Sequence, residues 1–279
     1  MAGITAAQVK ELRDATNVSM MECKKALVET DGDNEKAMRL LRERGVAIAS
    51  KRAEKSANQG LVAAEVYNGG RTGVMVEVNC ETDFVARNED FQQFVAELLV
   101  QSRDFNDGEL AEAVKDELAD KIAAIGENLI VRRNAKFELQ GRGAIASYIH
   151  LGGKIGLLVE VGCEKEDTPA AEPFQELVKD ITLHIAAANP AYLQRAEVPQ
   201  EVIDSEKSIF EKQAEGKPAN IVDKIVAGKI DKYFGQNCLI EQGFVKDPDQ
   251  TVQQLVDAKG KELGDTLSIR RYVRYQIGA

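Results

Sequence analysis

The chain contains an internal duplication at a constant offset of 83 residues. When residues 60–100 are aligned with residues 143–183 without a gap, 14 of the 41 pairs are identical, whereas composition alone would give roughly 3. The identical positions include turn glycines, a strand-like apolar run and the beginning of a helix-like run. A chain that repeats itself in this way is expected to build the same structural unit twice.

Each copy has the pattern of two antiparallel strands followed by a helix. The first strand alternates, a Gly-Gly turn follows, and the second strand is more continuously apolar. Connections this short join antiparallel neighbours. The pattern covers residues 61–66, residues 73–78 and a helix from Glu89 in the first copy, and residues 144–149, residues 156–161 and a helix from Glu172 in the second.

A second repeat with a different offset predicts a third strand in each copy. Residues 126–133 resemble residues 264–271 at an offset of 138, which exceeds the first offset by 55 residues. The second copy must therefore contain an insertion, which lies between His184 and Gly264.

The insertion has the pattern of a helical hairpin. Residues 200–215 and 219–234 carry apolar residues at helical spacing, and Gly216-Lys217-Pro218 separates them. Two helices joined by such a turn form an antiparallel pair that projects from the core. Most of the apolar stripe is interpreted as the internal seam of this hairpin, and its tip and outer face are left open as a docking surface.

Three short helices are predicted before the duplication. Thr5 and Ser19 each begin a capping box, Asp33 is suited to cap a third helix, and Gly45 is expected to end it. The unit resembles a ubiquitin-associated domain. Residues 49–58 are small and charged, which indicates a solvated connector.

These patterns define an α+β fold with an N-terminal three-helix domain, a duplicated core of small antiparallel sheets with helices, and an inserted antiparallel coiled-coil hairpin. The predicted boundaries are 1–48 for the ubiquitin-associated-like domain, 49–58 for the linker, 59–141 and 142–279 for the two core subdomains, and about 195–240 for the hairpin.

Composition argues against several classes of function. A net charge of -10 and a pI near 5.0 do not suit nucleic-acid binding, which needs a basic surface. No apolar run approaches the roughly 20 residues of a membrane span. The four cysteines are far apart and there are only two histidines, so no metal site, cofactor or catalytic set is predicted. We expect a cytoplasmic protein that is not an enzyme and binds no nucleotide directly.

Two glycine-rich motifs and the two histidines have structural explanations. The segment 141–146 matches a dinucleotide pattern, but the duplication predicts a strand where that pattern requires a helix. The segment 151–154 is explained as the turn equivalent to residues 68–71. His184 is interpreted as a satisfied core histidine, and His150, at a strand end before a turn, as the better contact candidate.

The two copies differ most between their second strand and their helix. The first copy has Thr82-Asp83-Phe84-Val85, and the residue aligned with Phe84 is the charged Asp167. An apolar residue would be expected there if the common fold needed one. The difference therefore suggests that Asp83 and Phe84 serve something outside the shared core, although a buried Phe84 with local compensation is the competing interpretation.

Two segments are similar to the signatures of the bacterial elongation factor Ts family. They are Val9-Lys-Glu-Leu-Arg13 with Met20-Met-Glu-Cys-Lys-Lys-Ala-Leu27, and Glu77-Val-Asn-Cys-Glu-Thr-Asp-Phe-Val85. The resemblance extends over essentially the whole chain. It implies an exchange factor that promotes GDP release from the GTPase elongation factor Tu during translation elongation.

The resemblance also implies which residues bind that partner. Family members insert the segment that corresponds here to Thr82, Asp83, Phe84 and Val85 into the GTPase, where it disturbs the bound Mg²⁺. Further contacts are expected from Arg13, Met20 and Met21 in the helical domain and from His150. A homodimer or a 2:2 assembly with the GTPase is left open, and a scaffold without exchange activity is the alternative function.

Overall fold

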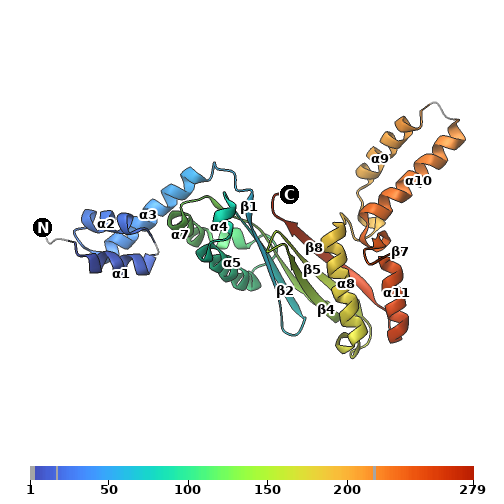
Figure 1. The fold of residues 1–279 in the computed structure, drawn as a ribbon, viewed down its shortest axis with the longest axis horizontal. Coiled ribbons are helices and arrows are strands. Elements are labelled where there is room, and N and C mark those ends of the chain that lie inside the picture. The colour runs from blue at the N-terminus through green and yellow to red at the C-terminus, as the bar shows by residue number, and fades with distance from the viewer. Residues whose placement is uncertain (1–3, 17, 216–217) are drawn as a thin grey trace.

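The computed structural model describes residues 4–16, 18–215 and 218–279. The molecule is elongated, with a small helical unit at one end, two antiparallel sheets in the middle and a helical hairpin projecting near the other end (Figure 1). The mixed α/β class with small antiparallel sheets agrees with the sequence prediction.

The N-terminal unit consists of α1 (Ala6–Thr16), α2 (Met20–Glu29) and α3 (Asn34–Arg52). The predicted capping residues begin all three helices. The side chains of Thr5 and Gln8 exchange hydrogen bonds with each other's backbone N–H groups, and Ser19 and Asp33 accept from the third residue beyond them. A small buried cluster that includes Leu12 and Leu27 holds the helices together.

The predicted helix end at Gly45 is wrong, because α3 continues to Arg52. Glycine weakens an isolated helix by about 1 kcal/mol relative to alanine, but here it lies against α7 (Lys115–Ile125), where a Cβ would stand 3.5 Å from that of Ala123. Packing on α7 therefore supports α3 beyond the glycine, and the first four residues of the predicted ten-residue linker are helical.

The first copy of the core forms a three-stranded sheet in the order β1-β2-β3. Its strands are antiparallel, and the helices that follow β2 cover one face. Its elements are β1 (Gln59–Tyr67), β2 (Thr72–Cys80), α4 (Asp83–Ala86), α5 (Glu89–Gln101), η1 (Ser102–Asp104), α6 (Leu110–Ala113), α7 and β3 (Leu129–Glu138).

The second copy repeats this arrangement in the order β4-β5-β8 and adds the insertion. Its elements are β4 (Arg142–His150), β5 (Ile155–Cys163), η2 (Thr168–Ala170), α8 (Glu172–Ala188), η3 (Arg195–Glu197), α9 (Gln200–Gln213), α10 (Ala219–Asn237), η4 (Leu239–Glu241), β6 (Gly243–Phe244), β7 (Asp247–Thr251), α11 (Val252–Leu263) and β8 (Ser268–Gln276).

The predicted strand pairs and the starts of α5 and α8 are confirmed. The third strands begin within the predicted segments but extend further. The equivalent helices α7 and α11 were not predicted, because the two copies share few residues there.

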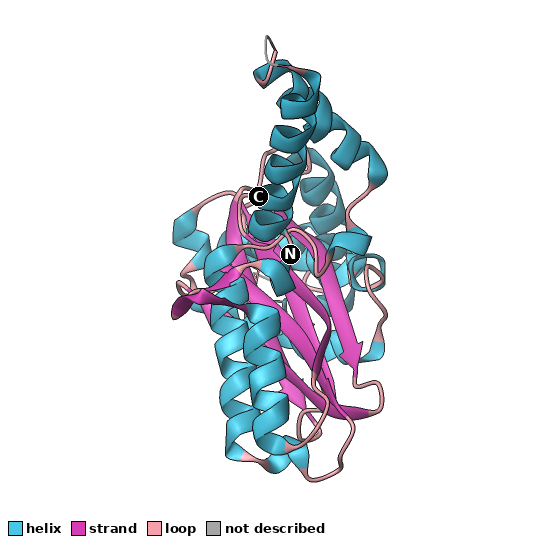
Figure 2. Cartoon of the chain, turned by 90° about the vertical axis from the view of Figure 1, so that its right-hand side faces the viewer, coloured by secondary structure: helices cyan, strands magenta, loops and turns pink. Residues whose placement is uncertain are grey.

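The two sheets pack against each other between the outer helices (Figure 2). Two equivalent backbone hydrogen bonds make their contact reciprocal. Val62 N donates to Gly153 O at 2.7 Å, and the equivalent Ile145 N donates to Gly70 O at 2.8 Å. Such exchange is the signature of an isologous, two-fold-like interface. The duplicated halves are therefore joined like two subunits within one chain.

The insertion forms the expected helical hairpin of α9 and α10. Residues of both helices pack into one cluster, which confirms the seam, whereas Ile209 and Ile221 remain exposed. Of the predicted Gly216-Lys217-Pro218 turn, residues 216–217 lie outside the described part of the chain.

Candidate functional site

The segment after β2 forms the single-turn helix α4. Thr82 is its N-cap, and its hydroxyl accepts a hydrogen bond from Val85 N at 3.3 Å. The carboxylate of Asp83 forms an ion pair with Arg87 at 3.0 Å. Four residues are too few for a stable isolated helix, so contacts with the core must hold this turn.

Phe84 is 82% exposed, although residues on either side are tied to the core. Val85 packs partly against the hydrophobic core of the first copy, which includes Val76 and Phe91, and Ala86 is buried. The structure therefore excludes a core role for the Phe84 side chain. Burial of such a ring in another molecule would be favourable, because aromatic side chains carry large apolar areas.

Two acidic residues tie the turn to the loop before β3. Glu127 accepts from Thr82 N at 3.0 Å and from its hydroxyl at 2.7 Å. The loop before β3 also donates to the segment after β2, because Glu81 accepts a hydrogen bond from Asn128 N at 2.7 Å. Glu81 also forms an ion pair with Arg52 at 3.0 Å. The Asn128 N–H and then the Arg52 guanidinium lower the pKa of Glu81.

His150 lies at the exposed end of β4, next to the beginning of β1. Its Nδ1 is 3.0 Å from the hydroxyl of Tyr148, and the two rings stack. The following turn is joined to β1 by Lys154 Nζ, 3.0 Å from the side-chain oxygen of Gln59, a residue that pairs with Cys80 just before the Thr82–Val85 turn. The turn after His150 is thus linked, through the beginning of β1, to the strand end that precedes Thr82.

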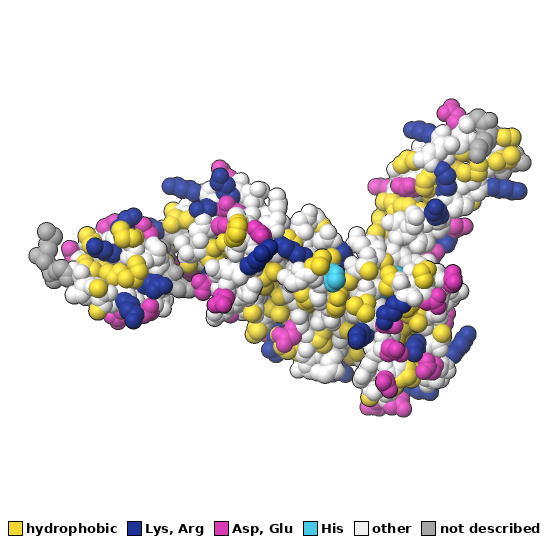
Figure 3. Space-filling view, in the orientation of Figure 1, with side chains coloured by type: hydrophobic (Ala, Val, Ile, Leu, Met, Phe, Trp, Pro, Cys, Tyr) yellow, Lys and Arg dark blue, Asp and Glu magenta, His cyan; other side chains and the backbone are white. Residues whose placement is uncertain are grey.

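Leu151 is a contact candidate that sequence reasoning missed. It is 68% exposed and has a φ of 50°, in the turn directly after His150. The equivalent residue of the first copy is Asn68, which is suited to this left-handed conformation. The alignment of the two copies places the apolar Leu151 opposite Asn68, and this difference could have indicated a contact residue from the sequence alone. In Figure 3, hydrophobic and basic side chains gather around a histidine near the middle of the molecule.

The other predicted contact residues lie on a separate unit. Arg13 is exposed in the last turn of α1, and Met20 and Met21 are exposed at the beginning of α2, with Met21 at 64%. In Figure 1, α1 and α2 lie well away from α4, and α3 connects the two regions. The structure therefore separates this trio from Phe84.

His184 is a satisfied core residue, as predicted. Its Nδ1 accepts from Val245 N at 3.2 Å, so its Nε2 carries the proton and donates to Gln242 Oε1 at 2.9 Å. Burial lowers the pKa of His184. Burial likewise raises the pKa of the Cys80 and Cys238 thiols to about 11, which makes them poor nucleophiles at neutral pH.

Among the residues with assigned positions, no group of three metal-binding side chains occurs. In the same part of the chain, no helix is long and apolar enough to span a membrane.

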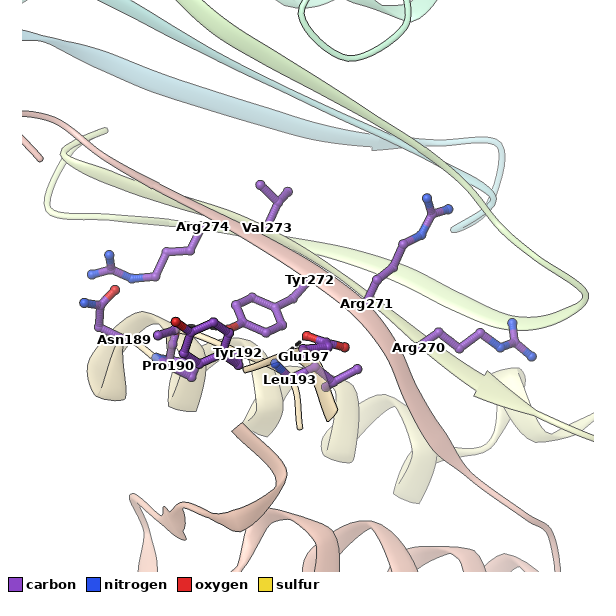
Figure 4. A pocket seen from close by; sticks show the side chains of 11 residues that line it. Asn189, Pro190, Tyr192, Leu193, Glu197, Arg270, Arg271, Tyr272, Val273 and Arg274 are labelled. Carbon is purple, nitrogen blue, oxygen red and sulfur yellow. Dashed lines mark hydrogen bonds between the residues drawn. The ribbon is translucent and has the colours of Figure 1, made fainter. Parts of the chain in front are cut away.

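A cleft of about 310 Å³ lies along the outer edge of β8 (Figure 4). Tyr272 points toward Pro190 and donates to its carbonyl at 2.8 Å, and Glu197 accepts from Leu193 N at 2.9 Å. Arg271 points away and pairs with the buried Glu160. Tyr272 thus ties the beginning of the insertion to β8, whereas Glu197 bonds within the insertion.

A duplicated core that displays an exposed phenylalanine on a tethered turn has the features of a protein-binding module. The model of the family described as elongation factor TS matches residues 81–279. Proteins named elongation factor Ts from Trichlorobacter lovleyi, Clostridium botulinum and Syntrophotalea carbinolica are 46%, 46% and 47% identical to the chain, over 99% of its length and 93% of theirs. The chain belongs to the elongation factor Ts family.

Proposed function

We propose that this protein is a guanine-nucleotide exchange factor that promotes GDP release from elongation factor Tu during translation elongation. Family membership over the whole chain supports this function and does not favour the alternative of a scaffold without exchange activity. The observation that carries the proposal is the 82% exposure of Phe84 on a turn whose neighbours are fixed to the core. The protein would act by binding and not by covalent catalysis.

Phe84 would enter the GTPase next to its nucleotide site. A nucleotide held by Mg²⁺ and a phosphate loop leaves slowly, because several charge-assisted contacts must break together. Mg²⁺ requires near-ideal octahedral coordination, so a shift of about an ångström in the surrounding segments would weaken it. By linkage, a factor that weakens GDP binding is itself bound less tightly when nucleotide is present, so incoming GTP would displace it.

The residues of the Thr82–Val85 turn would have distinct roles. Phe84 would be the desolvated anchor. Asp83 would supply an orienting polar contact, and it would have to exchange its ion pair with Arg87 for one with the partner. Thr82 bonds to Glu127, and Val85 packs against the hydrophobic core of the first copy, so we assign both residues to support of the turn.

Further contacts would come from two other regions. His150 would be one of them, and its hydrogen bond with the Tyr148 hydroxyl would orient the imidazole ring. Arg13, Met20 and Met21 would form a second contact region on the helical unit. Because α3 packs on α7, the spacing between this region and Phe84 would be set before binding, which reduces the entropic cost of association.

The finer organisation is proposed on the same basis. Residues 1–48 would be a ubiquitin-associated-like domain, 59–141 and 142–279 the two core subdomains, and residues of about 195–240 a coiled-coil hairpin that reaches another part of the partner. The charged residues 49–58 would connect the first two, although their first part belongs to α3. We place the protein in the cytoplasm with its GTPase, either as a homodimer or in a 2:2 assembly with that partner.

The proposal is tested by stopped-flow release of a fluorescent GDP analogue from purified elongation factor Tu. We expect strong acceleration by the wild-type protein and a loss of about 10- to 100-fold with Phe84→Ala, because a central anchor contributes roughly 2 kcal/mol or more to binding. The stability of the variant should stay within about 0.5 kcal/mol of wild type, as for other exposed positions.

Val100→Ala provides the matched control, because Val100 is an exposed apolar residue at the other end of α5. It should leave nucleotide release unchanged. If well-folded wild-type protein failed to accelerate release, the exchange function would be rejected. If Phe84→Ala retained full activity, only the role of the Thr82–Val85 turn would be rejected.

A further inference from the structure

The carboxylate of Glu127 is the main polar attachment of the Thr82–Val85 turn to the core. It accepts two hydrogen bonds from Thr82, one from the backbone N–H at 3.0 Å and one from the hydroxyl at 2.7 Å. The same hydroxyl accepts from Val85 N at 3.3 Å. A chain of hydrogen bonds therefore runs from Glu127 through Thr82 to the backbone beside Phe84.

The equivalent acid of the second copy, Asp265, makes the same kind of attachment. Its carboxylate accepts from the backbone N–H groups of Glu164 and Lys165 at 3.2 and 3.1 Å, and from the hydroxyl of Thr168 at 2.5 Å. The Thr168 hydroxyl, together with these N–H groups, lowers the pKa of Asp265 to about 2. Both copies thus tie the loop after their second strand to an acid before their third strand.

The difference between the copies lies in what the attached loop displays. In the second copy the loop carries charged residues and the short η2 turn, whereas in the first it carries the exposed Phe84. With 82% of Phe84 exposed, little packing of its own holds the ring in one direction. The direction of the Phe84 ring must therefore follow the backbone of α4, in which Phe84 is the second residue.

We infer that Glu127 is a positioning residue of the exchange reaction, which holds Thr82 so that the free protein already presents Phe84 in its binding direction. This role rests on the proposed function of the Thr82–Val85 turn. Preorganisation of this kind raises the rate because less ordering remains to be done on binding. Other attachments, such as the hydrogen bond from Cys80 Sγ to Thr82 O at 3.1 Å, restrain the position of Thr82. They do not use its backbone N–H or its hydroxyl, the two groups that donate to Glu127.

The test compares Glu127→Ala with Asp265→Ala, which removes the equivalent attachment from the copy without Phe84. The first readout is hydrogen–deuterium exchange of residues 82–88 in the free protein. Glu127→Ala should accelerate exchange in this segment, and Asp265→Ala should not. Unchanged protection in Glu127→Ala would overturn the inference, whatever the nucleotide assay shows.

The second readout is the release of labelled GDP from elongation factor Tu at saturating factor. Glu127→Ala should slow release by about tenfold, since small misplacements of a contact group are costly, whereas Asp265→Ala should match wild type. In the Phe84→Ala background, Glu127→Ala should have no further effect. Equal effects of both alanine variants, or a full Glu127 effect without Phe84, would show a general loss of stability and overturn the inference.

The two readouts separate the inference from the function on which it rests. If the turn loosened in Glu127→Ala but wild-type protein did not accelerate GDP release, the proposed function would fail and the claim of a role in exchange would fail with it. If release depended on Phe84 but not on Glu127, only the inference would fail. Glu127→Gln should give an intermediate loss, because its amide can accept only through one oxygen.

Discussion

The environment of a single residue in this protein indicates whether it stabilises the fold or is available to contact a partner. His184 and His150 are the only histidines of the chain, and they represent the two cases. His184 is buried with both ring nitrogens paired, whereas His150 is exposed at the end of β4. The first can therefore affect stability strongly, and the second is free to contact a partner.

His184 should make the stability of the protein depend on pH. Burial lowers its pKa from the ordinary 6.5 in the folded state, so the unfolded chain binds a proton more readily. Its contribution is fully present above the unfolded pKa and is lost as pH falls through the lowered folded pKa. Urea unfolding at pH 7.5 and 5.5 should show a lower free energy at the acidic pH.

The two histidines can be distinguished by substitution. His184→Gln, which retains one donor and one acceptor, should flatten the pH dependence between these two values. His150→Gln should preserve it. The assignment would be wrong if His150→Gln were the variant that abolished the dependence.

At the scale of elements, the orientation of the α9–α10 hairpin depends on a few polar contacts at its base. Arg195 in η3 forms a bidentate pair with Glu241, with both N–O distances 2.6 Å, and a bond to Asp231 of α10 at 2.9 Å. Its guanidinium also lies over the ring of Phe234, 4.6 Å from the centroid. A planar guanidinium that makes bidentate contacts fixes the relative orientation of its partners better than the single ammonium group of a lysine would.

Loss of Arg195 should broaden the range of hairpin orientations more than it lowers stability. Spin labels on Asp223→Cys in α10 and Glu97→Cys in α5 would report this as a wider distance distribution in Arg195→Ala. Because Arg195 is half exposed, the free energy of unfolding should fall by only about 1 kcal/mol. Lys259→Ala, which breaks one ion pair between α11 and α8 and one within α11, is the matched control, and it should leave the distribution unchanged.

At the scale of the whole molecule, two buried glutamates join the duplicated halves. Glu77 and Glu160 are equivalent and fully buried, and each pairs with arginines of its own copy. These arginines then cross the interface. Arg133 lies over Tyr275 of the second copy at 4.0 Å, and Arg271 lies over Phe137 of the first at 4.2 Å. The reciprocal geometry resembles that of a homodimer interface.

Arg271→Met should destabilise the protein by about 3 kcal/mol, because it leaves the Glu160 carboxylate buried with a weakened set of partners. Adding Glu160→Gln should recover part of the loss by removing the buried charge. Arg142→Met, at an exposed arginine, should cost under about 0.5 kcal/mol. Urea unfolding would measure all three, and an Arg271 effect no larger than that of Arg142 would contradict this account.

Much of this fold could be read from local patterns and from the duplication. Three features depend on near neighbours and on periodicity: the strand pairs, the helical hairpin and the capping residues of the N-terminal helices. For the strand pairs, the same pattern occurs in both copies, so each copy supports the prediction for the other. The aligned Asp167 also pointed to Phe84 as a residue outside the core. These features were accessible because their causes lie within a few residues or repeat in register.

Tertiary contacts decided the rest. The passage of α3 through Gly45 depends on α7, some 70 or more residues further on, where packing exceeds the cost of one glycine. The link between the turn after His150 and the beginning of β1 results from the two-fold-like packing of the sheets. The attachment of Thr82 to Glu127 joins loops 45 residues apart. Local sequence could not show these contacts, because each is stabilised only when distant segments exclude water together.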